Sequence, residues 1–265
     1  MKFNENRTGT GTKEWSEYSF NIGQGCSNNC LYCYARANAL RYKKISSRDE
    51  WQNEIVNEKA VSRAGIKRNG IIMFPTTHDI TPTYLEPSII ALKKMLSAGN
   101  HVLIVSKPRF DCIKQVCAEL ESFKEQILFR FTIGTLDNSL LKAWEPGAPN
   151  AGQRTASLTL ARSYGYQTSI SMEPFLGDVR DVIDTFTALE PFVTDKIWIG
   201  KMNKITARVK EDSPEIKVAI ELIEKQQSDK NIRWLYEQLK SHPKVAWKDS
   251  IKQVITELLK AGDQL

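Results

Sequence analysis

Short apolar segments alternate with amphipathic segments along most of this chain, and this alternation limits its possible folds more than any other feature. The apolar segments are rich in β-branched and aromatic residues, which predicts strands. We expect strands at residues 18–23, 70–75, 101–106, 127–133, 167–172 and 196–200. Strands that alternate with helices favour an α/β fold with a parallel sheet and right-handed crossovers.

Helices are predicted between these strands. Their expected spans are residues 34–41, 48–64, 86–98, 110–121, 152–164 and 179–189. In the span 86–98 the apolar residues fall near one face, and Gly99 and Asn100 end the pattern. The spacing suits an open or closed barrel, and it suits a doubly wound sheet as well.

In both arrangements the active site lies at the carboxyl ends of the strands. The segments that follow the predicted strands are residues 24–33, 76–81, 107, 134–138, 173–175 and 201–204. Polar residues gather in most of these segments. We therefore expect the functional side chains there.

The first of these segments carries a cluster of cysteines. Cys26, Cys30 and Cys33 have the spacing C-x3-C-x2-C in a polar, Asn-rich loop. Thiolates are soft ligands that suit zinc or an iron–sulfur cluster. A structural zinc site needs a fourth protein ligand, and the candidates are His78, His101, His242, Cys112 and Cys117. In a [4Fe–4S] cluster, three cysteines leave one iron open to a substrate or cofactor.

Composition excludes several classes of protein. Of the 265 residues, 41% are hydrophobic and 26% charged, so the chain can bury a sizeable core. Five clustered or isolated cysteines do not suit a disulfide framework, and the polar start lacks an apolar leader. No apolar stretch is long enough to span a membrane. We expect a cytoplasmic protein, and its net charge of +6 weakly favours an anionic partner.

The cysteine loop follows the first strand, and an aromatic residue, Tyr32, directly precedes Cys33. This pattern resembles the C-x3-C-x-aromatic-C signature of the radical S-adenosylmethionine (SAM) enzymes. The resemblance implies a partial (βα)6 TIM-like barrel and a [4Fe–4S] cluster on Cys26, Cys30 and Cys33. It also implies SAM at the fourth iron, cleaved by one electron to methionine and a 5′-deoxyadenosyl radical that abstracts hydrogen from a substrate.

Other segments resemble the spore photoproduct lyase-like branch of that superfamily. They are residues 73–79 (MFPTTHD) and 145–149 (EPGAP), with Arg154 and the pair Gly165-Tyr166. The lyase itself needs a further, hydrogen-donating cysteine, and neither Cys112 nor Cys117 is assigned to that role, so DNA repair is not inferred. The resemblance implies a lyase or transferase reaction and an electron donor of the flavodoxin or ferredoxin type. The substrate is open, with a nucleic acid or nucleotide as one candidate.

Candidate cofactor-binding residues stand at or near the ends of predicted strands and in the motif. They are Tyr32, Thr76, Thr77, Asp79, Thr132, Thr135, Arg154 and Glu173. An Arg154 fork suits the SAM carboxylate, although an ion pair with Glu145 is an alternative. Asp79 also suits an Asx-type turn. The catalytic candidates are His78 as an acid or base, and Lys107 and Lys201, which suit a phosphate.

The predicted organisation has three parts. Residues 1–15 form an N-terminal extension, residues 16–210 the barrel, and residues 211–265 a helical C-terminal extension packed on the barrel. Helices in the last part are expected at residues 214–225, 228–239 and 247–259, with Trp234, Tyr236 and Trp247 packing against the barrel.

Two alternatives stand beside the enzyme. A zinc-stabilised nucleic-acid-binding module without catalysis predicts stoichiometric zinc, no SAM binding and salt-dependent binding of DNA or RNA. An inactive barrel that serves as a scaffold is disfavoured by the complete set of three motif cysteines.

Overall fold

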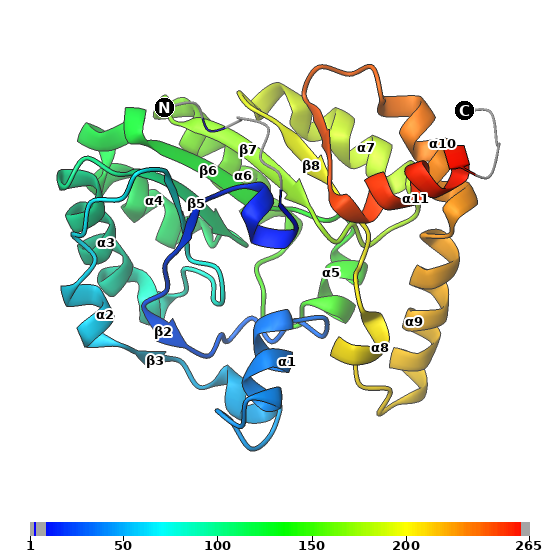
Figure 1. Cartoon of the computed structure of the whole chain (residues 1–265), viewed down its shortest axis with the longest axis horizontal. Helices are drawn as coiled ribbons and strands as arrows, with labels where there is room; N and C mark the ends of the chain where they lie inside the picture. The colour runs from blue at the N-terminus through cyan, green and yellow to red at the C-terminus, as the bar shows by residue number, and fades with distance from the viewer. Residues whose placement is uncertain (1–2, 4–8, 261–265) are drawn as a thin grey trace.

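The structure, a computed structural model, describes residue 3 and residues 9–260 (Figure 1). Its centre is a parallel sheet of seven strands in sequence order. The strands are β1 (Tyr18–Ser19), β4 (Ile71–Phe74), β5 (His101–Ser106), β6 (Ile127–Thr132), β7 (Gln167–Met172), β8 (Ile197–Ile199) and β9 (Val245–Trp247). The expected α/β fold with parallel strands is confirmed.

Helices cover one face of this sheet. They include α3 (Pro82–Ser97), α4 (Phe110–Glu119), α6 (Ala151–Ser163) and α7 (Val179–Leu189). Polar caps set where two of them begin: Asn150 accepts a hydrogen bond from the amide of Gln153 at the start of α6, and Asp178 caps α7 in the same way. The predicted spans agree with these helices to within a few residues.

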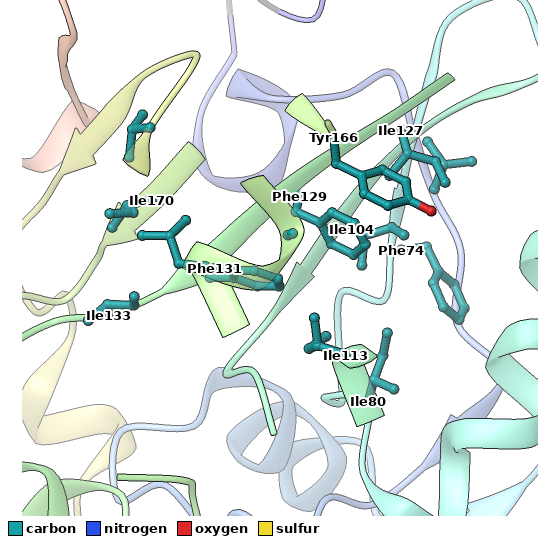
Figure 2. Close-up of a cluster of buried hydrophobic side chains, with 14 of the residues drawn as sticks. Phe74, Ile80, Ile104, Ile113, Ile127, Phe129, Phe131, Ile133, Tyr166 and Ile170 are labelled. Atoms are coloured by element: carbon teal, nitrogen blue, oxygen red, sulfur yellow. The ribbon is translucent and has the colours of Figure 1, made fainter. Parts of the chain in front are cut away.

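Both faces of the sheet are buried, and this explains why its strands are continuous apolar runs. Every residue of β6 is buried. Phe129 and Phe131 face the helices within the main core, which Figure 2 shows. Leu128 faces the opposite side, where it packs in a smaller cluster with Trp15 and Met73. This opposite side is called the inner face below.

The segment before β1 lies on the inner face. A short 3-10 helix, η1 (Gly11–Glu14), leads into Trp15, and Figure 1 shows this helix in front of the sheet. The Trp15 ring meets the Trp198 ring of β8 edge-on at a centroid distance of 5.8 Å. The N-terminal segment therefore fills the space that an open barrel leaves at its centre.

The prediction of one helix over residues 48–64 is wrong. The structure has a 3-10 turn, η2 (Asp49–Gln52), then β3 (Ile55–Val56) and a short helix, α2 (Glu58–Ser62). β3 pairs antiparallel with β2 (Gly23–Gln24), and the Asn57 side chain caps α2. Tertiary pairing with the cysteine loop outweighs local helical pattern here. The expected first strand, residues 18–23, is likewise divided into β1 and β2.

The C-terminal segment contains the three expected helices and one strand that the sequence did not predict. The helices are α9 (Pro214–Gln226), α10 (Asp229–Leu239) and α11 (Asp249–Lys260). β9 precedes α11 and pairs parallel with β8. Its three residues are too few to show a periodic pattern. Tyr236 and Trp247 pack against the core, whereas Trp234 is exposed. The boundary at residue 210 stays a prediction.

Three short helices complete the description. They are α1 (Tyr34–Arg41), which follows the cysteine loop as predicted, α5 (Asn138–Trp144) and α8 (Ile205–Arg208). Within the described ranges, no helix is long and apolar enough to cross a membrane.

Candidate active site

A cavity of about 470 Å³ lies at the carboxyl ends of the parallel strands. Side chains from the ends of β4 to β9 and from the cysteine loop form its wall. The wall contains all three motif cysteines together with Tyr32, Thr76, Thr77, His78, Asp79, Lys107, Thr132, Glu173 and Lys201. The structure therefore brings most of the predicted site residues around one space.

The cysteine loop is held at several points by backbone contacts. Gly25 opens it at a φ of +92°, a conformation that L side chains rarely adopt. The Cys26 amide donates to the carbonyl of Trp51 at 2.7 Å, and the Leu31 amide donates to that of Trp144 at 2.9 Å. Gly147 approaches the loop so closely that a Cβ there would lie 2.2 Å from the Ser27 carbonyl oxygen.

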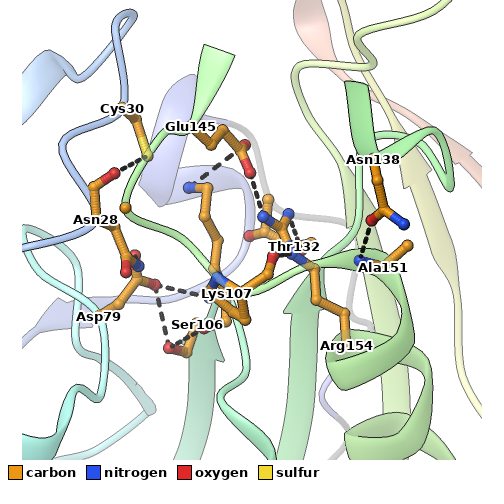
Figure 3. Close-up of polar contacts among 12 residues, drawn as sticks. Asn28, Cys30, Asp79, Ser106, Lys107, Thr132, Asn138, Glu145, Ala151 and Arg154 are labelled. Carbon is orange, nitrogen blue, oxygen red and sulfur yellow. Dashed lines mark hydrogen bonds and ion pairs between the residues drawn. The ribbon is translucent and has the colours of Figure 1, made fainter. Parts of the chain in front are cut away.

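The Asn28 side chain connects this loop to the barrel. Its amide nitrogen donates to Asp79 Oδ2 at 2.8 Å, and its oxygen accepts from Arg109 Nη2 at 2.8 Å. Arg109 also donates to the carbonyl of Gly147 at 2.6 Å. Asn28 is fully buried, so both halves of its amide need these partners. Figure 3 shows Asn28 beside Asp79 and below Cys30.

Asp79 is the acceptor at the centre of these contacts. Its Oδ1 accepts from the Lys107 amide at 2.7 Å and from Ser106 Oγ at 3.1 Å. Burial disfavours the carboxylate, but the Lys107 ammonium and the hydrogen bonds lower the pKa of Asp79 below its usual value. Asp79 therefore stays ionised and anchors the loop to the ends of β4 and β5.

A second buried group of polar side chains surrounds Glu145. Its carboxylate accepts from the Tyr32 hydroxyl and pairs with the Arg154 guanidinium, while Lys107 Nζ lies 3.9 Å from Oε1 (Figure 3). Burial favours the neutral amine of Lys107, but Cys30, Tyr32, Glu145 and Asp79 raise its pKa well above the usual value. Lys107 thus presents a cation to the cavity.

The three cysteines are free thiols in the wall of this cavity. Burial raises the pKa of the Cys30 thiol to about 12, and burial with the nearby Asp79 raises that of Cys26. Within the part of the chain that the structure describes, no group of three or more His, Cys, Asp or Glu side chains is arranged around a metal position. By donor chemistry, three soft thiols on one loop fit an iron–sulfur cluster.

Of the five candidates for the fourth ligand of a zinc site, only His78 lines the cavity that contains the motif cysteines. Both ring nitrogens of His78 are engaged: Nε2 accepts from the Ile22 amide at 3.3 Å, and Nδ1 lies 3.1 Å from the Asp79 carbonyl oxygen. Cys112 and Cys117 lie in the main core. His78 also stacks on Tyr84 at 4.2 Å, and burial lowers its pKa. These contacts favour a structural role for His78 over acid–base chemistry.

Thr76 and Thr77 stand at the cavity with their backbone held by Asn21. Asn21 Oδ1 accepts from the Thr76 amide at 2.7 Å and from the Thr77 amide at 2.9 Å. Tyr34 donates its hydroxyl to the Thr76 carbonyl. These hydrogen bonds fix the backbone of the segment after β4 at the cavity wall.

Two predicted cofactor residues do not line the cavity. Thr135 is fully buried and donates to Asp181 Oδ1 at 2.9 Å. Arg154 is also fully buried. Its guanidinium pairs with Glu145 and donates hydrogen bonds to the Thr132 carbonyl at 3.2 Å and to the Pro149 carbonyl at 2.8 Å. The ion pair with Glu145, the alternative noted from sequence, is what the structure contains.

Several site residues were missed from sequence. Asn28, Arg109, Asn21 and Lys248 each connect segments that are far apart in the chain. Only the position of Asn28 inside the cysteine motif offered a local signal. The others show no pattern, because their role depends on which strands and loops become neighbours.

Comparison with known proteins supports the fold and leaves the activity open. No family model matches the chain. A curated relative, the uncharacterized protein ORF301 of Acidianus two-tailed virus, is 25% identical over 201 residues. The match covers 71% of this chain and 66% of that protein, just under two thirds of its length.

Solved structures share the fold at low sequence identity. A spore photoproduct lyase variant with bound AdoMet and dinucleoside spore photoproduct has a TM-score of 0.57 at 14% identity, covering 88% of this chain and 76% of that one. Streptococcus suis SuiB bound to S-adenosylmethionine has a TM-score of 0.54 at 12% identity, covering 90% and 53%. The chain thus shares its fold with these AdoMet-bound structures, and the predicted barrel-like α/β fold is confirmed.

Proposed function

We propose that this protein is a radical SAM enzyme. One observation carries the proposal: Cys26, Cys30 and Cys33 line a single cavity at the carboxyl ends of the strands of a parallel sheet. The chain's fold is shared with proteins whose structures contain AdoMet. A buried zinc site of four protein ligands has no comparable support.

The three cysteine thiolates would hold three irons of a [4Fe–4S] cluster, and SAM would occupy the adjoining cavity. With one electron from a donor of the flavodoxin or ferredoxin type, the bound cluster would supply the reductive cleavage of SAM into methionine and a 5′-deoxyadenosyl radical, which would take a hydrogen atom from substrate. The remaining contributions come from the chain's own side chains.

Lys107 is suited to an anionic group of the ligand. Its ammonium faces the cavity next to the cysteine loop, and its ion pair with Glu145 is long at 3.9 Å. A carboxylate in the cavity would complete the coordination of this cation. Thr77, Thr132 and Glu173 add hydrogen-bonding groups along the same wall.

The substrate class is proposed only broadly. Lys201 and Arg208 line the cavity near Asn203, and the chain carries a net charge of +6. These charges favour an anionic substrate such as a nucleotide or nucleic acid, acted on by a lyase or transferase type of reaction.

Anaerobic iron–sulfur reconstitution followed by SAM and dithionite tests the proposal. We expect about four irons per chain and formation of 5′-deoxyadenosine in the wild type, with both lost in Cys30→Ala. Cys117→Ala is the matched control, because Cys117 is a buried thiol in α4 away from the cavity. It should retain iron and product.

The opposite pattern would overturn the proposal. Stoichiometric zinc after anaerobic purification, with no iron uptake and no SAM binding, would favour the nucleic-acid-binding module. Equal loss of iron in Cys30→Ala and Cys117→Ala would show that the motif cysteines are not the ligands.

A further inference from the structure

The cavity has one wall that comes from the N-terminal segment. Residues 9–16, called the N-terminal strap here, cross the inner face of the sheet as η1 and the turns beside it. Thr10, Gly11, Thr12 and Trp15 of this strap line the cavity. The strap therefore borders whatever ligand the cavity holds.

A buried lysine from the other end of the chain fastens the strap. Lys248 directly follows β9, and its amide donates to the carbonyl of Ile199 in β8 at 2.9 Å. Its Nζ lies 2.7 Å from Glu14 Oε1 and donates to the carbonyl of Gly11 at 3.1 Å. Lys248 is only 1% exposed, so these contacts replace its hydration.

The same ammonium reaches the cavity wall. Lys248 Nζ lies 3.2 Å from Oε2 of Glu173, the predicted cofactor residue that follows β7. Burial raises the pKa of Glu173 and Lys248 lowers it, with the net effect upward. A single cation thus connects a strap carboxylate to a carboxylate of the cavity.

A cation–π contact with Trp15 is a second interaction between Lys248 and the strap. Lys248 Nζ lies 4.0 Å from the centre of the Trp15 ring, and the Arg130 guanidinium lies 4.7 Å from it. Trp15 is 6% exposed and also contacts Trp198. A cation over an indole face in a dry environment is an attractive arrangement.

We propose that Lys248 is a positioning residue that latches the strap over the cavity and orients Glu173 toward the ligand. Without it, the buried Glu14 and the half-buried Glu173 would lose the cation that they share, and the strap would be released. Because the strap lines the cavity, a bound ligand and a latched strap stabilise each other reciprocally. The identity of the ligand as SAM rests on the proposed function, whereas the latch does not.

Trypsin cleavage after Lys13 measures the latch directly. Lys13 is exposed but lies within η1, so cleavage requires local release of the strap. The reconstituted chain of 265 residues is digested briefly, and the N-terminal fragment is quantified by mass spectrometry. S-adenosylhomocysteine, which lacks only the methyl group of SAM, serves as the probe for the cavity.

Four variants sharpen the test. Lys248→Met should raise the rate of cleavage after Lys13 by about tenfold or more. Lys248→Arg, which keeps the positive charge, should be cleaved at close to the wild-type rate. Lys244→Met is the matched control, because Lys244 pairs with Glu190 at 2.6 Å outside the cavity. Glu14→Gln removes the strap carboxylate that pairs with Lys248. If Lys248→Met does not fold, Glu14→Gln serves as the test variant in its place.

The ligand arm separates the two proposals. S-adenosylhomocysteine should slow cleavage of the wild type and should bind Lys248→Met about tenfold more weakly than Lys244→Met. Wild-type cleavage rates in both Lys248→Met and Glu14→Gln would overturn the latch. Ligand binding to the wild type without protection of Lys13 would overturn the coupling. Failure of the wild type to bind the probe would count against the proposed function alone.

Discussion

Asn28 donates its side-chain amide to Asp79 at 2.8 Å, and this contact joins the cysteine loop to the end of β4. The other half of the amide accepts from Arg109. Asp79 in turn accepts from Ser106 and from the Lys107 amide, at the end of β5. One buried asparagine thus connects the loop of the three cysteines to the segments after β4 and β5 that form the cavity.

Replacing Asn28 with Ala should disturb both stability and the cysteine loop. It leaves Asp79 and Arg109 each short of a buried partner, so we expect the free energy of unfolding to fall by about 2 kcal/mol. Guanidinium denaturation measures this change, and iron content after reconstitution measures the loop. Asn150→Ala removes the cap of α6 at a cost of about 1 kcal/mol and should keep full iron content. Equal iron in both variants would contradict the anchoring role.

Breaking the buried pair of Glu145 and Arg154 should be more costly. Arg154→Met leaves the Glu145 carboxylate without its main cation, and buried pairs broken in this way typically lose about 3–5 kcal/mol. Urea denaturation is the measurement, and Lys93→Met, which removes a surface ion pair with Glu119, is the control with a change under about 1 kcal/mol. An unchanged stability in Arg154→Met would return this arginine to a role in ligand binding.

Lys107→Met tests the anion-binding side of the cavity. If the ammonium contacts the ligand carboxylate, the affinity for S-adenosylhomocysteine should fall about tenfold, which is about 1.4 kcal/mol. Isothermal titration of the reconstituted protein gives the dissociation constant. Lys201→Met serves as the comparison at the same cavity, since its Nζ pairs with Asp229 at 3.6 Å. Equal losses in the two variants would argue against a specific contact at Lys107.

Asp181 should produce a pH dependence of stability. Burial raises its pKa, and nearby aspartates add to this, while the hydrogen bond from Thr135 lowers it. Because the folded pKa lies above the unfolded value, ionisation favours the unfolded state, and stability is lost as the pH rises through the folded pKa. Asp181→Asn keeps an acceptor for Thr135 without this loss.

The expected gain for Asp181→Asn at pH 7 is under about 1 kcal/mol, because the carboxyl is only partly buried. The gain should shrink as the pH falls toward the ordinary value of 3.8. Denaturation curves of both proteins at several pH values provide the measurement. A gain that is constant with pH would assign the effect to packing and not to charge.

Prediction and structure agree best where the residue pattern within a single helix or strand is enough to identify it. The ranges 34–41, 101–106, 167–172 and 179–189 coincide with α1, β5, β7 and α7. Strands buried on both faces are continuous apolar runs, and amphipathic helices repeat at their own period, so local composition suffices for both. Residues 48–64 failed because β3 exists only through its pairing with β2.

Sequence alone determined the α/β alternation and the loop that carries Cys26, Cys30 and Cys33, because both are encoded in neighbouring residues. Only the tertiary structure decided that β9 joins the sheet, that Arg154 forms an ion pair with Glu145, and that Lys248 pairs with both Glu14 and Glu173. Such contacts join residues that are distant in the chain. A buried charge needs a partner because burial removes its hydration, and this burial arises only when the elements pack.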